Sequence, residues 1–252
     1  KINSYHSEIG SYCPVIYDLT VDTTDTTGDA GLFETFAGEL KNIRLADAQI
    51  KGSGNVGGLV GKLNGTTTID GCQVYLKNVK DKNIPGDEIF TKHTRIDGKV
   101  AGGLVGSTEE KPLTIQNSLA ATVIRGETAA GGLIGNGEGT LTVKGSYADC
   151  YISSNGKTGG LIGSRLGATS DLTIQNCYTA GFLEGQTTAG LVACDLSAKN
   201  NILQNIYSAC VPLDADKLLT YGTAGKNGTE AIVEHVYYLG ETENPDTTIG
   251  KK

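Results

Sequence analysis

A tetrapeptide of the form Gly-Leu-Val/Ile-Gly recurs along this chain of 252 residues. Four copies and a fifth that ends in alanine begin at Gly58, Gly103, Gly132, Gly160 and Gly190, and a degenerate copy begins at Gly31. Successive copies start 27, 45, 29, 28 and 30 residues apart. Repetition at a nearly constant period of this size is typical of solenoid proteins, in which each repeat is one structural unit.

A second set of equivalent positions gives the same period. These positions are Asn42, Gly71, Asn117, Gly145, Asn176, Asn205 and His235. They lie 28 to 31 residues apart, except for one step of 46 at the place where the first set also has its long step. Asparagine and glycine both tolerate a left-handed backbone conformation, so this pattern predicts a sharp bend once in every unit.

Short β-strands are predicted on both sides of this bend. The segments before it alternate or are β-branched, as in 113–115, 141–143 and 172–174, and such residues suit a half-buried pleated surface. We expect about three strands per unit: one at Gly-Leu-Val-Gly, one at Leu-Thr-Ile and one after the bend. Because one such unit cannot bury its apolar side alone, neighbouring units must stack.

The sequence therefore predicts an all-β parallel β-helix (β-solenoid) of about seven or eight coils, with roughly 29 residues per coil. A β-propeller needs longer units, and leucine-rich repeats need a denser leucine pattern. We expect a single domain, with regular repeats over 29–212 and an insertion near 77–100. Residues 1–28 and 213–252 fit the repeat poorly and are expected to form the atypical end coils.

Composition excludes several classes of function. The formal net charge is −7, which argues against binding to nucleic acid and to anionic membranes. No stretch has the length and apolarity of a transmembrane helix, so we expect no membrane insertion. The chain contains no methionine, so we expect it to be a processed or excised piece of a larger protein. We also expect this piece to be monomeric.

The repeat also predicts the state of four of the six cysteines. Cys72 and Cys177 share one set of equivalent positions three coils apart, and Cys150 and Cys210 share another two coils apart. Two coils correspond to about 10 Å, beyond the reach of a disulfide. These four are expected to be buried thiols, whereas Cys13 and Cys194 fall outside both sets and are not assigned.

Sequence motifs for catalysis or metal binding are not found in the chain. It has no HExxH motif, no GxSxG motif and no phosphate-binding loop, so we expect no catalytic residue, no metal and no cofactor. Asp22, Asp25 and Asp29 form an acidic run, but their spacing differs from that of a calcium-binding loop.

The insertion is the first candidate binding region. It carries charged residues that include His93, Arg95 and Asp97, and insertions in solenoids often form the binding loops. Three interpretations stay open at this point: a solvated loop, a contact for a ligand or partner, and catalysis on a polysaccharide.

A column of tyrosines is the second candidate. Tyr147, Tyr178, Tyr207 and Tyr237 follow the predicted bend at the same position in successive units. Aromatic rings in such a ladder can stack on sugar rings. A ladder of identical residues also forms simply because the same environment repeats, so a purely structural role is the alternative.

The Gly-Leu-Val/Ile-Gly segments, each followed by a Leu/Thr-x-Ile strand and then Asn/Gly-Cys/Ser-Tyr, resemble the GLUG motif. That motif is known from repeat regions of bacterial surface proteins, including adhesin-like proteins and the non-catalytic parts of IgA-cleaving metallopeptidases. The resemblance covers roughly residues 30–211, with Ala193 and the insertion as departures. It implies a secreted or cell-surface bacterial protein and carries over no catalytic residue.

The leading hypothesis is a non-catalytic adhesive or structural module of a bacterial cell-surface protein. It would be extracellular and would present loops or a sheet face to a glycan or to a protein of a host or neighbouring cell. The alternatives are a polysaccharide-degrading β-helix enzyme and a passive spacer that carries a peptidase or binding domain.

Overall fold

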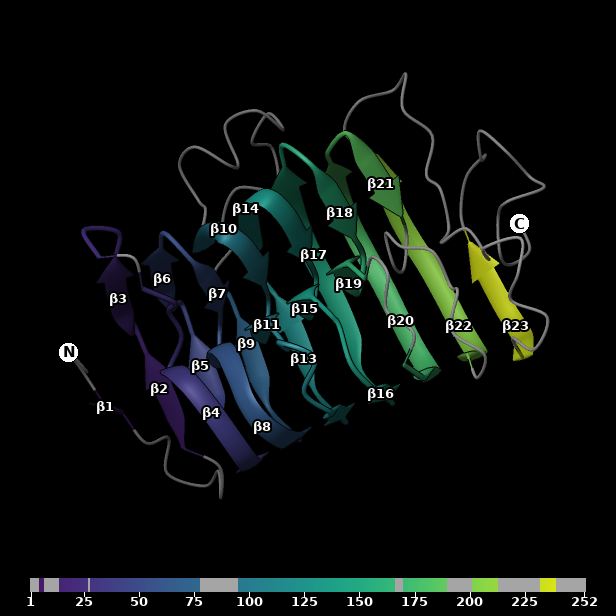
Figure 1. Cartoon of the computed structure of the whole chain (residues 1–252), viewed down its shortest axis with the longest axis horizontal. Coiled ribbons are helices and arrows are strands. Elements are labelled where there is room, and N and C mark those ends of the chain that lie inside the picture. Colours follow the sequence, from purple (N-terminus) through teal and green to yellow (C-terminus); the bar gives the residue numbers. More distant parts are fainter. Residues whose placement is uncertain are drawn as a thin grey trace.

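The computed structural model describes residues 5–6, 14–26, 28–77, 95–165, 170–189, 201–212 and 232–238. All the secondary structure in these ranges is β-strand and turn, and the strands stack in parallel as a β-solenoid of about 6 turns with ~29 residues per turn. Figure 1 shows the coils following one another from the purple N-terminal end to the yellow C-terminal end. The predicted fold is confirmed, and the described turns are slightly fewer than the seven or eight coils predicted.

Each wall of the solenoid is a ladder of equivalent strands from successive coils. The wall that follows the bend begins with β2 (Val15–Tyr17), β5 (Arg44–Ala46), β9 (Gln73–Tyr75) and β13 (Leu119–Ala121). It continues with the longer strands β17 (Tyr147–Ser154), β20 (Leu172–Glu184), β22 (Asn201–Pro212) and β23 (Ile232–Tyr238).

The same wall is extended sideways by the next segment of each coil. In the first coils this segment is a separate strand: β3 (Thr20–Thr23), β6 (Gln49–Gly52) and the first half of β10 (Ile96–Gly102). The ladder then passes through β14 (Val123–Gly131) into the second halves of β17 and β20. The long strands therefore make one broad sheet at the C-terminal end of the rod (Figure 1).

Three further ladders complete each coil. The first contains β7 (Asn55–Gly57), the second halves of β10 and β14, β18 (Lys157–Gly159) and β21 (Thr187–Ala189). The second contains β4 (Phe33–Lys41), β8 (Val60–Asp70), β11 (Val105–Ser107), β15 (Ile134–Asn136) and β19 (Ile162–Ser164). The third runs from β4 and β8 through β12 (Leu113–Gln116) and β16 (Leu141–Lys144) to β20 and β22.

One described pairing breaks the parallel pattern. The short strand β1 (Tyr5–His6) pairs antiparallel with β2, at the N-terminal end of the rod. An antiparallel partner cannot continue a parallel ladder, and it occupies part of the edge that the first coil would otherwise expose.

The predicted bend is confirmed at all seven positions. The φ angles are positive at every one: 55° at Asn42, 65° at Gly71, 51° at Asn117, 54° at Gly145, 55° at Asn176, 53° at Asn205 and 51° at His235. These values lie in the left-handed region, where asparagine and glycine are tolerated best. The bend turns the chain from the Leu-Thr-Ile wall into the tyrosine wall.

The Gly-Leu-Val-Gly segment differs from its prediction as a strand. In the second coil Gly58 and Leu59 form a corner between β7 and β8, and only Val60 begins the next strand. The turn from residue 118 to 145 accordingly contains four strands, β13 to β16, where three were predicted. A Cβ atom on Gly58 would overlap the carbonyl oxygen of Gly103, so the glycine is needed for close approach of two coils at this corner.

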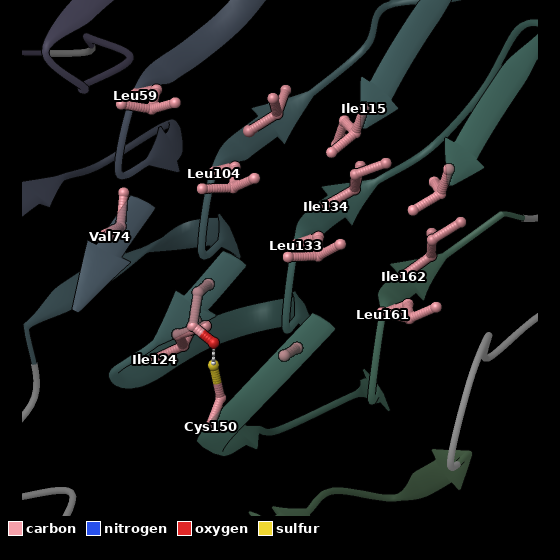
Figure 2. Close-up of a cluster of buried hydrophobic side chains, with 14 of the residues drawn as sticks. Leu59, Val74, Leu104, Ile115, Ile124, Leu133, Ile134, Cys150, Leu161 and Ile162 are labelled. Atoms are coloured by element: carbon pink, nitrogen blue, oxygen red, sulfur yellow. Dashed lines mark hydrogen bonds between the residues drawn. The ribbon is translucent and has the colours of Figure 1, made fainter. Parts of the chain in front are cut away.

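The leucine of the motif anchors the core. Leu59, Leu104, Leu133 and Leu161 have no exposed surface, and they stack one above another in the interior (Figure 2). The carbonyl oxygen of Leu104 accepts hydrogen bonds from the amides of Leu59 at 2.9 Å and Val60 at 3.0 Å. Burial of one such side chain stabilises the fold by roughly 1.5–3 kcal/mol, and each leucine also fixes the register of the next coil.

The four cysteines of the described coils are buried thiols, as predicted. Cys150 and Cys210 lie on either side of Gly181 in the stacking register, and the Cys150 thiol donates a hydrogen bond to the carbonyl of Ala120 at 3.3 Å. Burial raises the pKa of the Cys150 thiol to about 12 and that of Cys210 to about 11. Cys13 and Cys194 lie outside the described residues.

The insertion leaves the stacking intact. Residues 78–94 lie outside the described part of the chain, and β10 rejoins the ladder by pairing Ile96 with Ile50 of the preceding coil. Asp97 and Lys99, which were predicted within the insertion, lie in β10 and so belong to the solenoid wall.

Candidate functional site

The broad sheet formed by β17, β20, β22 and β23 presents tyrosines on its outer side. Side chains alternate along each strand: Ala148, Thr179 and Ser208 are buried, and the residues before them point outward. The outward residues are Tyr147, Tyr178, Tyr207 and Tyr237, each between 40% and 42% exposed. The pleat of the strand therefore places every one of these tyrosines on the same surface.

These tyrosines form one continuous ladder, as the sequence predicted. Tyr147 pairs in register with Tyr178, Tyr178 with Tyr207, and Tyr207 with Tyr237. The rings of Tyr178 and Tyr207 lie with their centroids 5.8 Å apart and their planes within 9° of parallel. Stacked pairs of this kind stabilise by roughly 0.5–1.5 kcal/mol beyond the area that they bury.

A second column of large side chains, which was not predicted from the sequence, runs beside the first. Tyr151 and Phe182 stack with centroids 5.0 Å apart and an interplanar angle of 25°, and Val211 follows them in register. The signal was present, because Tyr151 is four residues after Tyr147 and Phe182 is four residues after Tyr178. Residues four apart on a strand share a face, since side chains alternate with a period of two.

One aspartate and two alanines separate the two columns. The outward positions between them are Asp149, Ala180 and Ala209, which align in register. We call the whole surface the aromatic face; it consists of Tyr147, Asp149, Tyr151, Tyr178, Ala180, Phe182, Tyr207, Ala209, Val211 and Tyr237. Asp149 is the one charged residue in this set, so the face carries a single negative charge.

A ladder of amides and carboxylates borders the aromatic face at the bend. Asn205 donates from its side-chain amide to Oδ1 of Asn176 at 2.9 Å, and His235 Nδ1 lies 3.0 Å from Oδ1 of Asn205. One position earlier in each coil, Gln175 donates to Gln204, and Gln204 donates to a carboxylate oxygen of Glu234 at 2.7 Å. These polar groups lie two or three residues before the tyrosines in the chain, at the same edge of the sheet.

Burial and neighbouring groups change the pKa of Tyr178. Its pKa is raised above the ordinary value, first by partial burial and then by the negative charge of Asp149 and the proximity of Tyr207. The phenol therefore keeps its proton over the whole physiological range and acts as a donor and an acceptor.

Arg95 and Asp97 lie on the same wall as the tyrosines, two coils or more towards the N-terminus. Arg95 is aligned with Val123, which pairs with Tyr151, so it shares the second column of the aromatic face. Asp97 shares the outermost column, where its neighbours are Lys51 on one side and Arg125 on the other. The Arg125 Nε atom donates to Oδ1 of Asp97 at 3.1 Å.

The structure thus brings six of the seven candidate residues onto one wall and leaves His93 outside the described residues. The partner of Asp97 was missed by the sequence analysis. Arg125 lies 28 residues after Asp97, one period of the repeat, which is the signal that identifies it. The pair raises the pKa of the Arg125 guanidinium through its hydrogen bond with Asp97.

The acidic run near the N-terminus has local partners. Asp22 accepts hydrogen bonds from the amide and hydroxyl of Thr24, and Asp29 accepts two from Asn55 and forms an ion pair with Lys62 at 3.0 Å. No group of three or more histidine, cysteine, aspartate or glutamate residues that would hold a metal ion occurs within the described coils.

The part of the chain that the structure describes has no helix long and apolar enough to cross a membrane. No protein-family model matches the chain, and neither a curated protein nor a solved structure is significantly similar to it. The function is therefore inferred from the solenoid and its aromatic face.

Proposed function

We propose that this chain is a non-catalytic adhesive or structural module of a bacterial cell-surface protein, and that the solenoid presents its aromatic face to a glycan or protein partner. The observation that carries the proposal is the ladder Tyr147, Tyr178, Tyr207 and Tyr237, whose rings stay more than one-third exposed on a regular sheet. The resemblance to GLUG repeats supports the extracellular and bacterial parts of the proposal.

Exposed rings at this density favour recognition by a partner. Isolated apolar residues on a surface are ordinary, whereas contiguous patches mark interaction sites. Tyrosine is enriched in such sites because its ring supplies area at a low cost in conformational entropy and its hydroxyl supplies a hydrogen bond. Here the rings are held by a parallel sheet, so little order has to be gained on binding.

A passive spacer is the second candidate, and one observation favours it. The stacking of Tyr178 on Tyr207 joins adjacent coils, which is a contribution that a rigid rod uses without any ligand. The enzyme alternative has less support, because the Asp97 carboxylate, the acid that would carry it, is engaged by Arg125 on the wall of the solenoid.

Binding of the purified chain to an array of glycans and host matrix proteins tests the proposal. A specific signal that falls in Tyr178→Ala supports an adhesive module. The matched control is Tyr17→Ala, because Tyr17 lies in β2 at the other end of the same wall, under the ammonium group of Lys77. A blank array with the folded protein would reject the adhesive role and leave the spacer.

A further inference from the structure

The aromatic face has a direction, which limits the shape of what it binds. Its columns cross the strands, so each runs parallel to the axis of the rod. Equivalent side chains in neighbouring coils are spaced by about 4.8 Å. An extended chain of six-membered sugar rings advances by a similar distance per sugar, so it meets an equivalent set of side chains at every coil.

The arrangement across the face suits a single extended chain. Tyr178 and Phe182 stand four residues apart on β20, with Ala180 between them, and Tyr207 and Val211 stand in the same relation around Ala209. Four residues along a strand correspond to roughly 13 Å. A band of small side chains is thus flanked on both sides by large ones over two consecutive coils.

Hydrogen-bonding groups of the right kind run parallel to this band. The amides of Asn176, Asn205 and Gln204 and the carboxylate of Glu234 lie along one border. Amides donate to and accept from sugar hydroxyls, and a carboxylate accepts from them. Aromatic rings beside such groups supply an apolar surface and polar contacts together, which is what the two sides of a sugar ring require.

Charge decides between classes of polysaccharide. Asp149 stands within the aromatic face, Glu184 lies in the outward column next to it and accepts a hydrogen bond from Ser153 at 3.1 Å, and Glu234 lies at the opposite border. The ten residues of the face include no arginine or lysine, and the whole chain has a net charge of −7. Two cationic side chains lie at its borders: Lys144, in register with Gln175, and Arg125, in register with Ser153 and hydrogen-bonded to Asp97. Carboxylates in these positions repel a polyanion and leave neutral sugars unaffected.

We infer that the aromatic face binds a non-anionic polysaccharide, built of uncharged or amine-bearing sugars, as an extended chain lying along the axis of the rod. This inference rests on the proposed adhesive function and specifies its ligand class. Carboxylates outnumber cationic side chains on the face and its borders, and this disfavours uronic-acid and sulfated polysaccharides as its ligands.

Calorimetric titration of the full chain with three hexasaccharides of different charge tests the inference. The probes are a β-1,4-glucose hexamer, a β-1,4-glucosamine hexamer and a galacturonic acid hexamer. We expect binding of the first two and none of the third, and weaker binding of the corresponding dimers, which span fewer coils. The Tyr178→Ala change weakens binding about tenfold, the size expected for one lost aromatic contact.

Two variants separate charge from stacking. Asp149→Asn weakens binding of the glucosamine hexamer and leaves binding of the glucose hexamer within about twofold, because only the former carries positive charges that the carboxylate attracts. Thr142→Ala, on the Leu-Thr-Ile wall away from the face, changes neither. Far-ultraviolet circular dichroism of each variant establishes that the solenoid is folded.

The possible failures are distinguishable. Preference for the galacturonic acid hexamer overturns the inference about charge and keeps the adhesive function. Binding of a proline-rich peptide or a matrix protein that depends on Tyr178, with no saccharide bound, also overturns the inference and keeps the function. No binding of any of these probes overturns both.

Discussion

Asn205 donates a hydrogen bond from its side-chain amide to Oδ1 of Asn176, one coil away, across 2.9 Å. Both residues have left-handed backbones, with φ of 53° and 55°. The same residue type therefore serves the bend in two ways: its backbone accepts the conformation and its side chain joins neighbouring coils. His235 continues the ladder at 3.0 Å from Asn205 Oδ1.

Substitution of Asn176 separates these two contributions. Asn176→Ala is expected to lower the free energy of unfolding by about 1–2 kcal/mol, because alanine is strained at positive φ and the amide contact is lost. Asn176→Gly keeps the conformation accessible and loses only the side chain, so its effect is smaller. Urea denaturation followed by circular dichroism measures both, and equal losses in the two variants would contradict the role given to the bend.

The buried leucine of the repeated motif provides a test of the core. Leu133→Ala is expected to lower the free energy of unfolding by about 2–5 kcal/mol. Leu133 is fully buried between Leu104 and Leu161, so its truncation leaves a cavity in the stacked interior. Leu119→Ala is the matched control, since Leu119 lies on the outer side of β13 and is only half-buried. The free energy of unfolding of the two variants is compared in urea, and similar losses would contradict the assignment of inner and outer sides.

The repeat predicted the bend well, because the residue types at equivalent positions share one explanation. It failed at the Gly-Leu-Val-Gly motif, where a glycine has more than one explanation. Asn42 and Gly71 occur at equivalent positions, and a left-handed bend is what those two residue types share. The glycines of Gly58-Leu59-Val60-Gly61 gave no such constraint, and the segment was taken as a strand. Position 58 needs glycine because a Cβ atom there would overlap the carbonyl oxygen of Gly103 in the next coil. This constraint is seen only when the coils are stacked.

The burial of the four thiols predicts that they are slow to react in the folded protein. Burial raises the pKa of Cys150 to about 12 and those of Cys177 and Cys210 to about 11, and it also raises that of Cys72. In a variant with Cys13 and Cys194 replaced by serine, we expect almost no reaction with an aromatic disulfide reagent at pH 8. All four thiols react once the protein is unfolded in urea.

These thiols also make stability fall in alkali. Above the ordinary thiol pKa of 9.0 the unfolded chain loses protons that the folded chain still holds, so the free energy of unfolding decreases as pH rises from about 9 towards 11 to 12. The loss is smaller in Cys150→Ala, which is measured by urea denaturation at pH 7.5 and pH 10. A stability that is independent of pH over this range would contradict the burial of neutral thiols.

The ion pair between Asp97 and Arg125 is expected to matter little for stability. Both side chains are partly exposed, and exposed pairs contribute about 0.2–1 kcal/mol. Asp97→Asn should therefore lower the free energy of unfolding by no more than about 1 kcal/mol, with a smaller effect in high salt. The measurement is urea denaturation at low and at 1 M salt. A loss of several kcal/mol in the free energy of unfolding would contradict the small contribution expected for the pair.

The candidate site was only partly predictable, for a reason that lies in the spacing. Tyr147 and Tyr178 were identified because like residues in one column are conspicuous. Tyr151, Phe182 and Val211 form a column of unlike residues, and Asp97 and Arg125 form a column of opposite charges. These residues also recur at the period of the repeat, but unlike side chains do not stand out as copies of one another, so each column is recognised only when the coils are aligned in register.

The central claim is that the tyrosine ladder is a binding surface as well as a structural one. The most direct measurement is a double-mutant cycle on ligand affinity, with Tyr178→Ala, Tyr207→Ala and the double variant titrated against whichever ligand the array identifies. We predict that each single change weakens binding about tenfold and that the double change abolishes it, while all three variants keep the circular dichroism spectrum of the solenoid. Unchanged affinity in all three variants would contradict the claim and would leave the ladder with a structural role alone.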